Sequence, residues 1–285
     1  MSPCKTSILA RVTSPSFSRL NPRFAPCTRL LWKSGVLGAL EAFAKAGFAA
    51  SEVWAQHLWE CGTSAEQVAQ HAKALGLGLS LHAPSYDLNP LSSNLEIRII
   101  SRRQVLESFE TAVKLGARVV VVHPGGLSSS TDAIEEYWLR LEEYAIILNE
   151  HAGKLGLMIG IEGMEKKRLQ FVTDLPALKR LAAILETNDL THCGLTLDIA
   201  HAATIGDALE FVQSTPRIVH AHLSDSSPTK THALLGEGLL NLPEIIPTLL
   251  QRLQPSPHGL IAIEGRYAAD EARAVELARL ALAGY

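Results

Sequence analysis

Eight short apolar runs alternate with eight amphipathic segments along the chain of 285 residues, and this alternation restricts the fold more than any other feature. The runs expected to be strands cover residues 7–12, 51–56, 77–83, 117–123, 157–163, 193–201, 217–225 and 259–265. The segments expected to be helices cover residues 35–46, 63–76, 96–115, 131–154, 174–186, 205–213, 241–253 and 270–282. Nearly continuous apolar strands that alternate with helices are typical of a parallel sheet buried on both faces. Eight such units predict an α/β fold, a single (β/α)8 TIM barrel over residues 1–285.

Composition excludes several other classes of protein. A doubly wound open sheet is the alternative fold, but no glycine-rich phosphate loop follows the first expected strand. Hydrophobic residues make up 47% of the chain and charged residues 19%, which is typical of a globular protein. No apolar run approaches the roughly 18 residues that a membrane helix needs. The four cysteines lie far apart without a CxxC pair, which argues against a disulfide framework or a cysteine zinc site and favours the cytoplasm.

The first 34 residues differ in charge from the rest of the chain. They contain six Lys or Arg and no Asp or Glu, in a chain with a net charge of −3. A Ser- and Arg-rich, acid-free start is also typical of an organelle transit peptide, so organellar import is the alternative to a cytoplasmic location. We favour a first strand at Ser7–Val12 followed by a basic loop, because cleavage would leave the barrel one strand short.

Six consecutive strands end on a residue type that binds metal or transfers protons. Their spacings of 41, 39, 36, 24 and 42 residues each correspond to about one βα unit. The carboxyl ends of barrel strands meet at one mouth, where active sites lie, so the sequence predicts one shared metal site. The six residues are His82, His123, Glu162, Asp198, His222 and Glu264.

The donor types restrict which metal is expected. Three carboxylates and three imidazoles without thiolates suit Zn²⁺, Mn²⁺, Co²⁺ or Fe²⁺ better than Ca²⁺. Four of the residues lie on adjacent strands (Glu162, Asp198, His222 and Glu264) and form the tightest set. Two arrangements remain open. Either one ion uses these four, or His82 and His123 complete a second site that Glu162 bridges.

Several segments resemble the xylose isomerase-like barrel superfamily, which includes sugar and sugar-phosphate isomerases and epimerases and the apurinic endonuclease IV family. In chain order they are LHAPSYDLNP, VVVHPGG, GIEGM, LTLDIAH, AHLSDS, THALLGEG and AIEGR, from about residue 36 to the C-terminus. The resemblance implies that the set of four is the metal site shared by both branches. It also implies that His82 and His123 correspond to ligands of a second zinc in endonuclease IV.

One departure separates the chain from the endonuclease branch. Endonuclease IV holds a third zinc with the histidine of a D-x-x-H motif, here His201, and with the Asp and His of a D-R-H motif. The second motif here is Lys230-Thr231-His232, so a lysine stands at a ligand position. A protonated lysine has no lone pair to offer a metal, and HALLGEG is similar to the isomerase branch. The resemblance therefore favours isomerase chemistry over phosphodiester cleavage.

Two mechanisms follow. In an isomerase or epimerase of a small sugar, sugar phosphate or related polyol, a divalent metal acidifies the carbon next to a carbonyl. Glu162 and Glu264 then remove and return the proton. The resemblance suggests that His201 holds a substrate oxygen, while His232, Lys230 and Arg266 would bind a terminal carboxylate or phosphate. The alternative is a two-metal phosphoester hydrolase.

The expected partner is a small molecule. The net charge is −3 and no basic run is interleaved with aromatic residues, so the sequence disfavours nucleic-acid binding. The oligomeric state stays open, with a homodimer as one alternative. Three residues near the predicted mouth are also ambiguous. Glu52 either faces substrate or pairs a charge at the rim. His220 is expected one layer below His222, where a core histidine is favoured over a group that supports the site from behind. Trp54 either lines the pocket or packs in the core.

Overall fold

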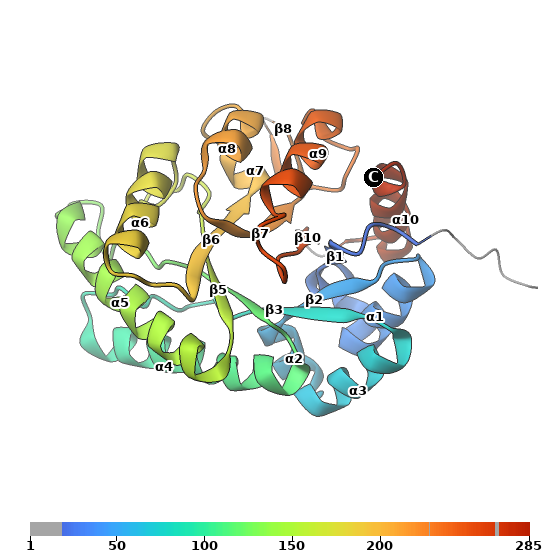
Figure 1. The fold of residues 1–285 in the computed structure, drawn as a ribbon, viewed down its shortest axis with the longest axis horizontal. Helices are drawn as coiled ribbons and strands as arrows, with labels where there is room; N and C mark the ends of the chain where they lie inside the picture. The colour runs from blue at the N-terminus through green and yellow to red at the C-terminus, as the bar shows by residue number, and fades with distance from the viewer. Residues whose placement is uncertain (1–18, 228, 266–267) are drawn as a thin grey trace, which may run out of the picture.

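The computed structural model describes residues 19–227, 229–265 and 268–285, and in them eight parallel strands form one sheet. Their order is β1-β10-β7-β6-β5-β4-β3-β2, the order of a TIM barrel. In Figure 1 the strands occupy the middle of the molecule, with helices around them. The strands are β1 (Phe24–Pro26), β2 (Ala50–Trp54), β3 (Gly78–His82), β4 (Val119–Val122), β5 (Met158–Glu162), β6 (Cys193–Asp198), β7 (Ile218–Leu223) and β10 (Ile261–Ile263).

The two ends of the sheet, β1 and β2, meet without a full ladder. An isolated parallel bridge joins Cys27 to Glu52, and the Ser51 hydroxyl donates a 2.7 Å hydrogen bond to the Pro26 carbonyl. These contacts bring the edges together in a nearly closed barrel. The fold is the predicted (β/α)8 TIM barrel.

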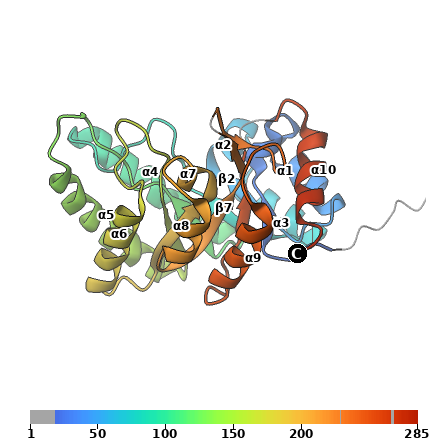
Figure 2. The same cartoon turned by 90° about the horizontal axis from the view of Figure 1, so that it is seen from above.

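The helices lie close to their predicted ranges. Figure 2 shows them from a second direction, with β2 and β7 between helices. Short elements that the sequence analysis did not predict are η1, α2, α7 and the antiparallel hairpin of β8 (Asp225–Ser227) and β9 (Lys230–Ala233). The helices are η1 (Thr28–Ser34), α1 (Gly35–Lys45), α2 (Ala55–Cys61), α3 (Ala65–Leu75), α4 (Leu95–Leu115), α5 (Ile134–Leu155), α6 (Leu175–Thr187), α7 (Ile199–Ala202), α8 (Ala208–Ser214), α9 (Leu242–Arg252) and α10 (Glu271–Leu282). Among the described helices, none combines the length and the apolar character needed to span a bilayer.

The first strand differs from the prediction. Ser7–Val12 lies outside the described residues, and the strand that pairs with β10 is β1, with Phe24 opposite Ile261. A three-residue strand that ends in a proline has too little alternation to be recognised from sequence. The barrel position is filled without Ser7–Val12, so counting strands no longer argues against a targeting segment. The expected basic loop also contains a helix, η1.

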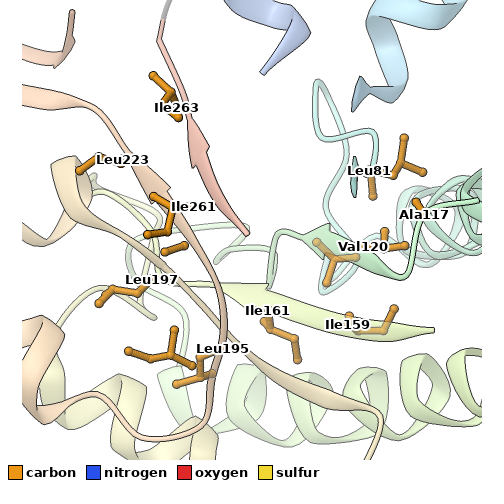
Figure 3. Close-up of a cluster of buried hydrophobic side chains, with 14 of the residues drawn as sticks. Leu81, Ala117, Val120, Ile159, Ile161, Leu195, Leu197, Leu223, Ile261 and Ile263 are labelled. Atoms are coloured by element: carbon orange, nitrogen blue, oxygen red, sulfur yellow. The ribbon is translucent and has the colours of Figure 1, made fainter. Parts of the chain in front are cut away.

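The barrel strands carry most of their large apolar side chains on the outward face, while Val121 and Trp54 are apolar residues of the inner face. The outward-facing residues of β3 to β10 join the hydrophobic core beneath the helices, as Figure 3 shows. They include Leu81, Val120, Ile159, Ile161, Leu195, Leu197, Leu223, Ile261 and Ile263. The alternate residues point into the barrel, and many of them are polar or small, such as Ser80, Gly160, Thr196 and His220. The interior therefore has room for a polar layer under the mouth.

Candidate metal centre and active site

Glu162, the last residue of β5, lies between two groups of histidines. Its Oε2 atom is 3.1 Å from His123 Nε2 and 3.5 Å from His82 Nε2. Its Oε1 atom is 3.3 Å from His222 Nδ1, on the other side. The expected bridging position of Glu162 matches this geometry, because each carboxylate oxygen faces a different set of donors.

His222, near the end of β7, is surrounded by carboxylates. Its Nδ1 atom is 3.0 Å from Glu264 Oε2, 3.3 Å from Glu162 Oε1 and 3.8 Å from Asp198 Oδ2. One donor atom from each of Glu162, Asp198, His222 and Glu264 lies within 4.8 Å of all the others, as it does for the set of His82, His123 and Glu162. The structure thus brings together the six strand-end residues, as two sets that share Glu162.

The tautomer of His82 is set by its surroundings. Nδ1 lies 2.7 Å from the Ala83 carbonyl and donates to it, because a carbonyl can only accept. The ring also stacks on Trp54, with the centroids 3.9 Å apart and the planes at 10°. Nε2 therefore turns its lone pair toward Glu162, the orientation of a metal ligand.

The turn after His123 requires both glycines of the HPGG motif. Gly125 has φ +91°, and a Cβ atom there would lie 2.9 Å from Leu91 Cγ. At Gly126 a Cβ atom would lie 2.8 Å from the Leu169 carbonyl oxygen. The Asn89 side chain then holds the turn, accepting from the Gly126 amide at 3.2 Å and donating to its carbonyl at 2.9 Å. This explains why the most apolar strand ends in a rigid loop that carries an imidazole.

Three donor atoms support a divalent ion at this site. His82 Nε2 and Asp198 Oδ2 are buried without a hydrogen-bond partner among the described residues, and the neighbours of Glu162 Oε2 are the imidazole nitrogens of His123 and His82. Buried polar atoms without partners are rare, and buried carboxylates are costly unless a cation or donors offset them. The donors are carboxylate and imidazole, which suit Zn²⁺, Mn²⁺ or Co²⁺. The residues fit a metal centre of one or two ions.

The buried carboxylates and His222 shift one another's pKa values. Burial by itself disfavours the Glu162 carboxylate, but the nearby charges of His222 and His123 outweigh burial and hold its pKa well below the usual range. The same competition between burial and His222 holds the pKa of Glu264 below its usual range. Burial opposes protonation of His222, yet Glu52, Glu162 and Glu264 raise its pKa well above the ordinary value. The raised pKa of His222 and the lowered pKa values of Glu162 and Glu264 thus have the same cause, the close approach of an imidazole and carboxylates in a buried site.

Arg29, in η1, is a site residue that the sequence analysis missed. Its Nη1 atom donates a 2.8 Å hydrogen bond to Glu264 Oε1, which leaves Oε2 facing His222. Its guanidinium lies over the Trp54 ring, 4.5 Å from the centroid. The only sequence signal was the basic first segment, which did not distinguish Arg29 from five other cations. Trp54 lines the cavity as well as packing on His82.

The four predicted substrate-binding residues have different positions. His201 lies in α7, directly after β6, donates from Nδ1 to the Gly163 carbonyl at 2.8 Å and places Nε2 3.1 Å from His232 Nε2. Both rings line the cavity above the metal donors. The Lys230 side chain is 61% exposed, 3.9 Å from Glu237, and does not line that cavity. Arg266 lies outside the described residues. The carboxylate that joins His201 and His232 in a third cluster is Glu165.

Glu52 is fully buried and does not line the cavity, so it occupies neither of the two positions considered for it, the rim and the substrate pocket. It points into the barrel from the middle of β2, with Oε1 3.2 Å from His222 Nε2 and Oε2 3.0 Å from His220 Nε2. His220 lies one layer below His222, as expected, but it contacts a carboxylate rather than apolar core. The sequence signal for this buried position was one carboxylate within the predicted strand segment SEVWA.

The model of the xylose isomerase-like TIM-barrel family matches residues 40–280. The chain belongs to this family. An uncharacterized protein of Methanocaldococcus jannaschii is 30% identical over 69% of the chain and 67% of that protein. A probable endonuclease 4 of Mycobacterium ulcerans is 28% identical over 66% of the chain and 74% of that protein. The crystal structure of a D-tagatose 3-epimerase-like protein superposes with a TM-score of 0.78 at 25% identity, covering 92% of this chain and 97% of the other.

The relatives of this xylose isomerase-like barrel agree with the resemblance found in the sequence. The family match covers every strand-end donor, from His82 to Glu264. The chain is similar both to an epimerase-like structure and to probable endonucleases, so family membership alone does not determine the reaction.

Proposed function

We propose that this barrel is a divalent-metal-dependent isomerase or epimerase of a small sugar, sugar phosphate or related polyol-type substrate. The observation that carries the proposal is the convergence of Glu162 and Glu264 on one nitrogen, His222 Nδ1, at 3.3 and 3.0 Å. Two carboxylates in such an arrangement can remove and return a proton at one substrate carbon. The similarity to a D-tagatose 3-epimerase-like protein supports the same reaction class.

Each residue of the site has a defined task in this reaction. Glu162, Asp198, His222 and Glu264 would hold the ion, which polarises a substrate carbonyl when bound and makes the neighbouring C–H bond more acidic. One of Glu162 and Glu264 removes the proton, and the other delivers a proton to the opposite face. Arg29 holds Glu264 in position from behind, since it binds Oε1 and leaves Oε2 toward the centre.

The size of the cavity favours a small substrate. Its volume is about 230 Å³, which corresponds to about eight water molecules at about 30 Å³ each. That space suits a monosaccharide better than a nucleic-acid strand. The polar lining, which includes Gln170, His201, His232 and Lys167, offers hydrogen bonds to several hydroxyl groups.

Solvent exchange tests the proposal directly. We would load the protein with Co²⁺ or Mn²⁺, incubate it with a panel of ketoses, aldoses and their phosphates in D2O, and follow deuterium at the carbon next to the carbonyl. We expect exchange with at least one substrate and a loss of about 10²–10⁴-fold in E162Q and E264Q. The control is E41Q, because Glu41 also pairs with a histidine, His71 at 3.2 Å, but lies away from the mouth. Full turnover in both E162Q and E264Q would refute the proton-transfer roles.

A two-metal phosphoester hydrolase is the second candidate. The observation in its favour is the set of His82, His123 and Glu162, which would hold a second ion beside the first. The similarity to a probable endonuclease 4 points the same way. Elemental analysis separates the two functions: two Zn per chain together with cleavage of abasic DNA or small phosphodiesters would favour the hydrolase, and one Mn or Co with sugar exchange would favour the isomerase.

A further inference from the structure

Glu52 is a charged residue in the interior of the barrel, where its exposed fraction is 0%. TIM-barrel interiors are ordinarily filled by branched apolar side chains, and a buried carboxylate is costly unless donors surround it. Glu52 is not part of the cavity lining, and with His220 and His222 it forms a fourth group of donor atoms within 4.8 Å of one another, one layer below the strand-end donors. Its position therefore requires a role beneath the site rather than in it.

The hydrogen positions around Glu52 can be assigned from a backbone amide. The Leu260 N–H donates to His220 Nδ1 at 3.3 Å, so that nitrogen is an acceptor. In neutral His220 the hydrogen must then be on Nε2, which lies 3.0 Å from Glu52 Oε2. The Ser80 hydroxyl approaches the same oxygen at 3.3 Å. Oε2 of Glu52 thus faces two donors.

The other oxygen of Glu52 determines the state of His222. Oε1 lies 3.2 Å from His222 Nε2, although the two atoms do not have hydrogen-bond geometry here; because an ionised carboxylate only accepts hydrogen bonds, a bond between them requires the hydrogen on Nε2. In the neutral ring, Nδ1 then presents its lone pair to the centre, where the Glu264, Glu162 and Asp198 oxygens lie at 3.0, 3.3 and 3.8 Å. The direction of the lone pair follows from a chain of contacts that begins at Leu260.

We propose that Glu52 is the positioning residue of the metal centre, which fixes His222 as the Nε2–H tautomer and directs Nδ1 to the ion. His220 and Ser80 orient Glu52 for this purpose. A carboxylate behind a metal-bound histidine raises the basicity of the ligand and restricts rotation of the ring, and its removal typically weakens metal affinity by about 10–100-fold. This inference rests on the proposed metal centre and is independent of the substrate.

Metal affinity provides the first test. In E52Q, one oxygen becomes an NH2 group that must face the N–H of either His220 or His222, so the His222 tautomer is no longer enforced. We expect the Kd for Co²⁺, measured by competition with a chelator, to rise about 10–100-fold, with a changed visible spectrum of the bound Co²⁺. E41Q is the matched control and should bind Co²⁺ as the unaltered protein does. A folded E52Q with unchanged Kd and spectrum would overturn the proposal.

A second measurement uses the unaltered protein, so it does not depend on whether E52Q folds. ¹⁵N NMR of the Zn²⁺-loaded protein, with the spectrum of H220N as an aid to assignment, reports which nitrogen of His222 carries hydrogen. Hydrogen on Nε2 and metal on Nδ1 are expected, and the reverse would refute the inference. Absence of sugar exchange would leave this result intact, whereas a protein that takes up no Co²⁺ or Zn²⁺ would overturn both this inference and the metal centre.

Discussion

Replacing Gly160 with alanine tests the packing of the polar layer beneath the metal donors. Gly160 lies in β5, two residues before Glu162, and points into the barrel toward the Thr196 side chain of β6. A methyl group at Gly160 would overlap the Thr196 hydroxyl, with Thr196 Cβ at 3.3 Å and His220 Cβ at 3.6 Å. The strand backbone on both sides is paired, so neither side can move away freely. We expect G160A to be destabilised as an overpacked interior.

The magnitude follows from the nature of the overlap. Extra methyl groups in a packed interior typically cost about 1–3 kcal/mol, which for a chain of this size lowers the melting temperature by about 2–6 °C. In T196A the overlapping oxygen is removed, and that oxygen has no hydrogen-bond partner among the described residues, so its loss breaks no bond. The double variant G160A/T196A should therefore be about 1–2 kcal/mol more stable than the two single effects predict.

Urea unfolding followed by circular dichroism and tryptophan fluorescence measures these differences. The control is G78A, because a Cβ atom on Gly78 of β3 would find its nearest neighbours at 3.8 and 4.0 Å, an ordinary contact. We also expect G160A to bind Co²⁺ more weakly and the double variant to recover, since Glu162 follows on the same strand. A G160A protein as stable as G78A, or no recovery in the double variant, would show that the interior is less tightly packed than described.

Three further predictions concern other parts of the molecule. N94A should lose about 1 kcal/mol in urea unfolding, because the Asn94 side chain accepts from the Glu96 and Ile97 amides at the start of α4; an unchanged midpoint would contradict this. Co²⁺ or Zn²⁺ at 100 times its Kd should stabilise the protein by about 2.7 kcal/mol, which raises the melting temperature by about 5 °C, and a chelator should reverse this increase. A melting temperature that changes with neither the metal nor the chelator would argue against the metal centre. In a C4S background at pH 8, an aromatic disulfide reagent should modify the exposed Cys61 at once, whereas Cys27 and Cys193 should react only on unfolding. Burial raises the pKa of the Cys193 thiol to about 12 and that of the Cys27 thiol well above its usual value. Rapid native modification of all three thiols would contradict the burial.

The outer half of the barrel was predictable from local signals. Residues such as Ile159, Ile161, Leu195 and Leu197 form runs that predict strands, and the helices between them have clear starts, such as the Ser64 capping box of α3. β1 was not predictable, since three residues ending at Pro26 carry almost no periodicity. Its place is decided by pairing with β10, a strand more than two hundred residues further along the chain.

The grouping of the candidate metal donors was predictable from strand positions. His82, Glu162 and Asp198 each end a strand, and parallel strands in a barrel end at one mouth, so strand register is enough to group them. Arg29 gave no such signal, because it lies outside the strands in η1 and reaches Glu264 only when β1 and β10 pair. Lys230 is the opposite case: its motif position suggested a site residue, but its side chain is 61% exposed, lies 3.9 Å from Glu237 and is not part of the cavity lining.

The sequence by itself determined the barrel, through alternating hydrophobicity, and the chemistry of its mouth, through the residue types that end the strands. The tertiary structure decided which atoms of those residues face one another. Glu52 of β2 meets His220 and His222 of β7 because the sheet curves until strands that are not neighbours face each other across the interior. No local sequence pattern around a strand carboxylate predicts a partner 170 residues away in the chain. Only closure of the barrel brings such a partner into contact.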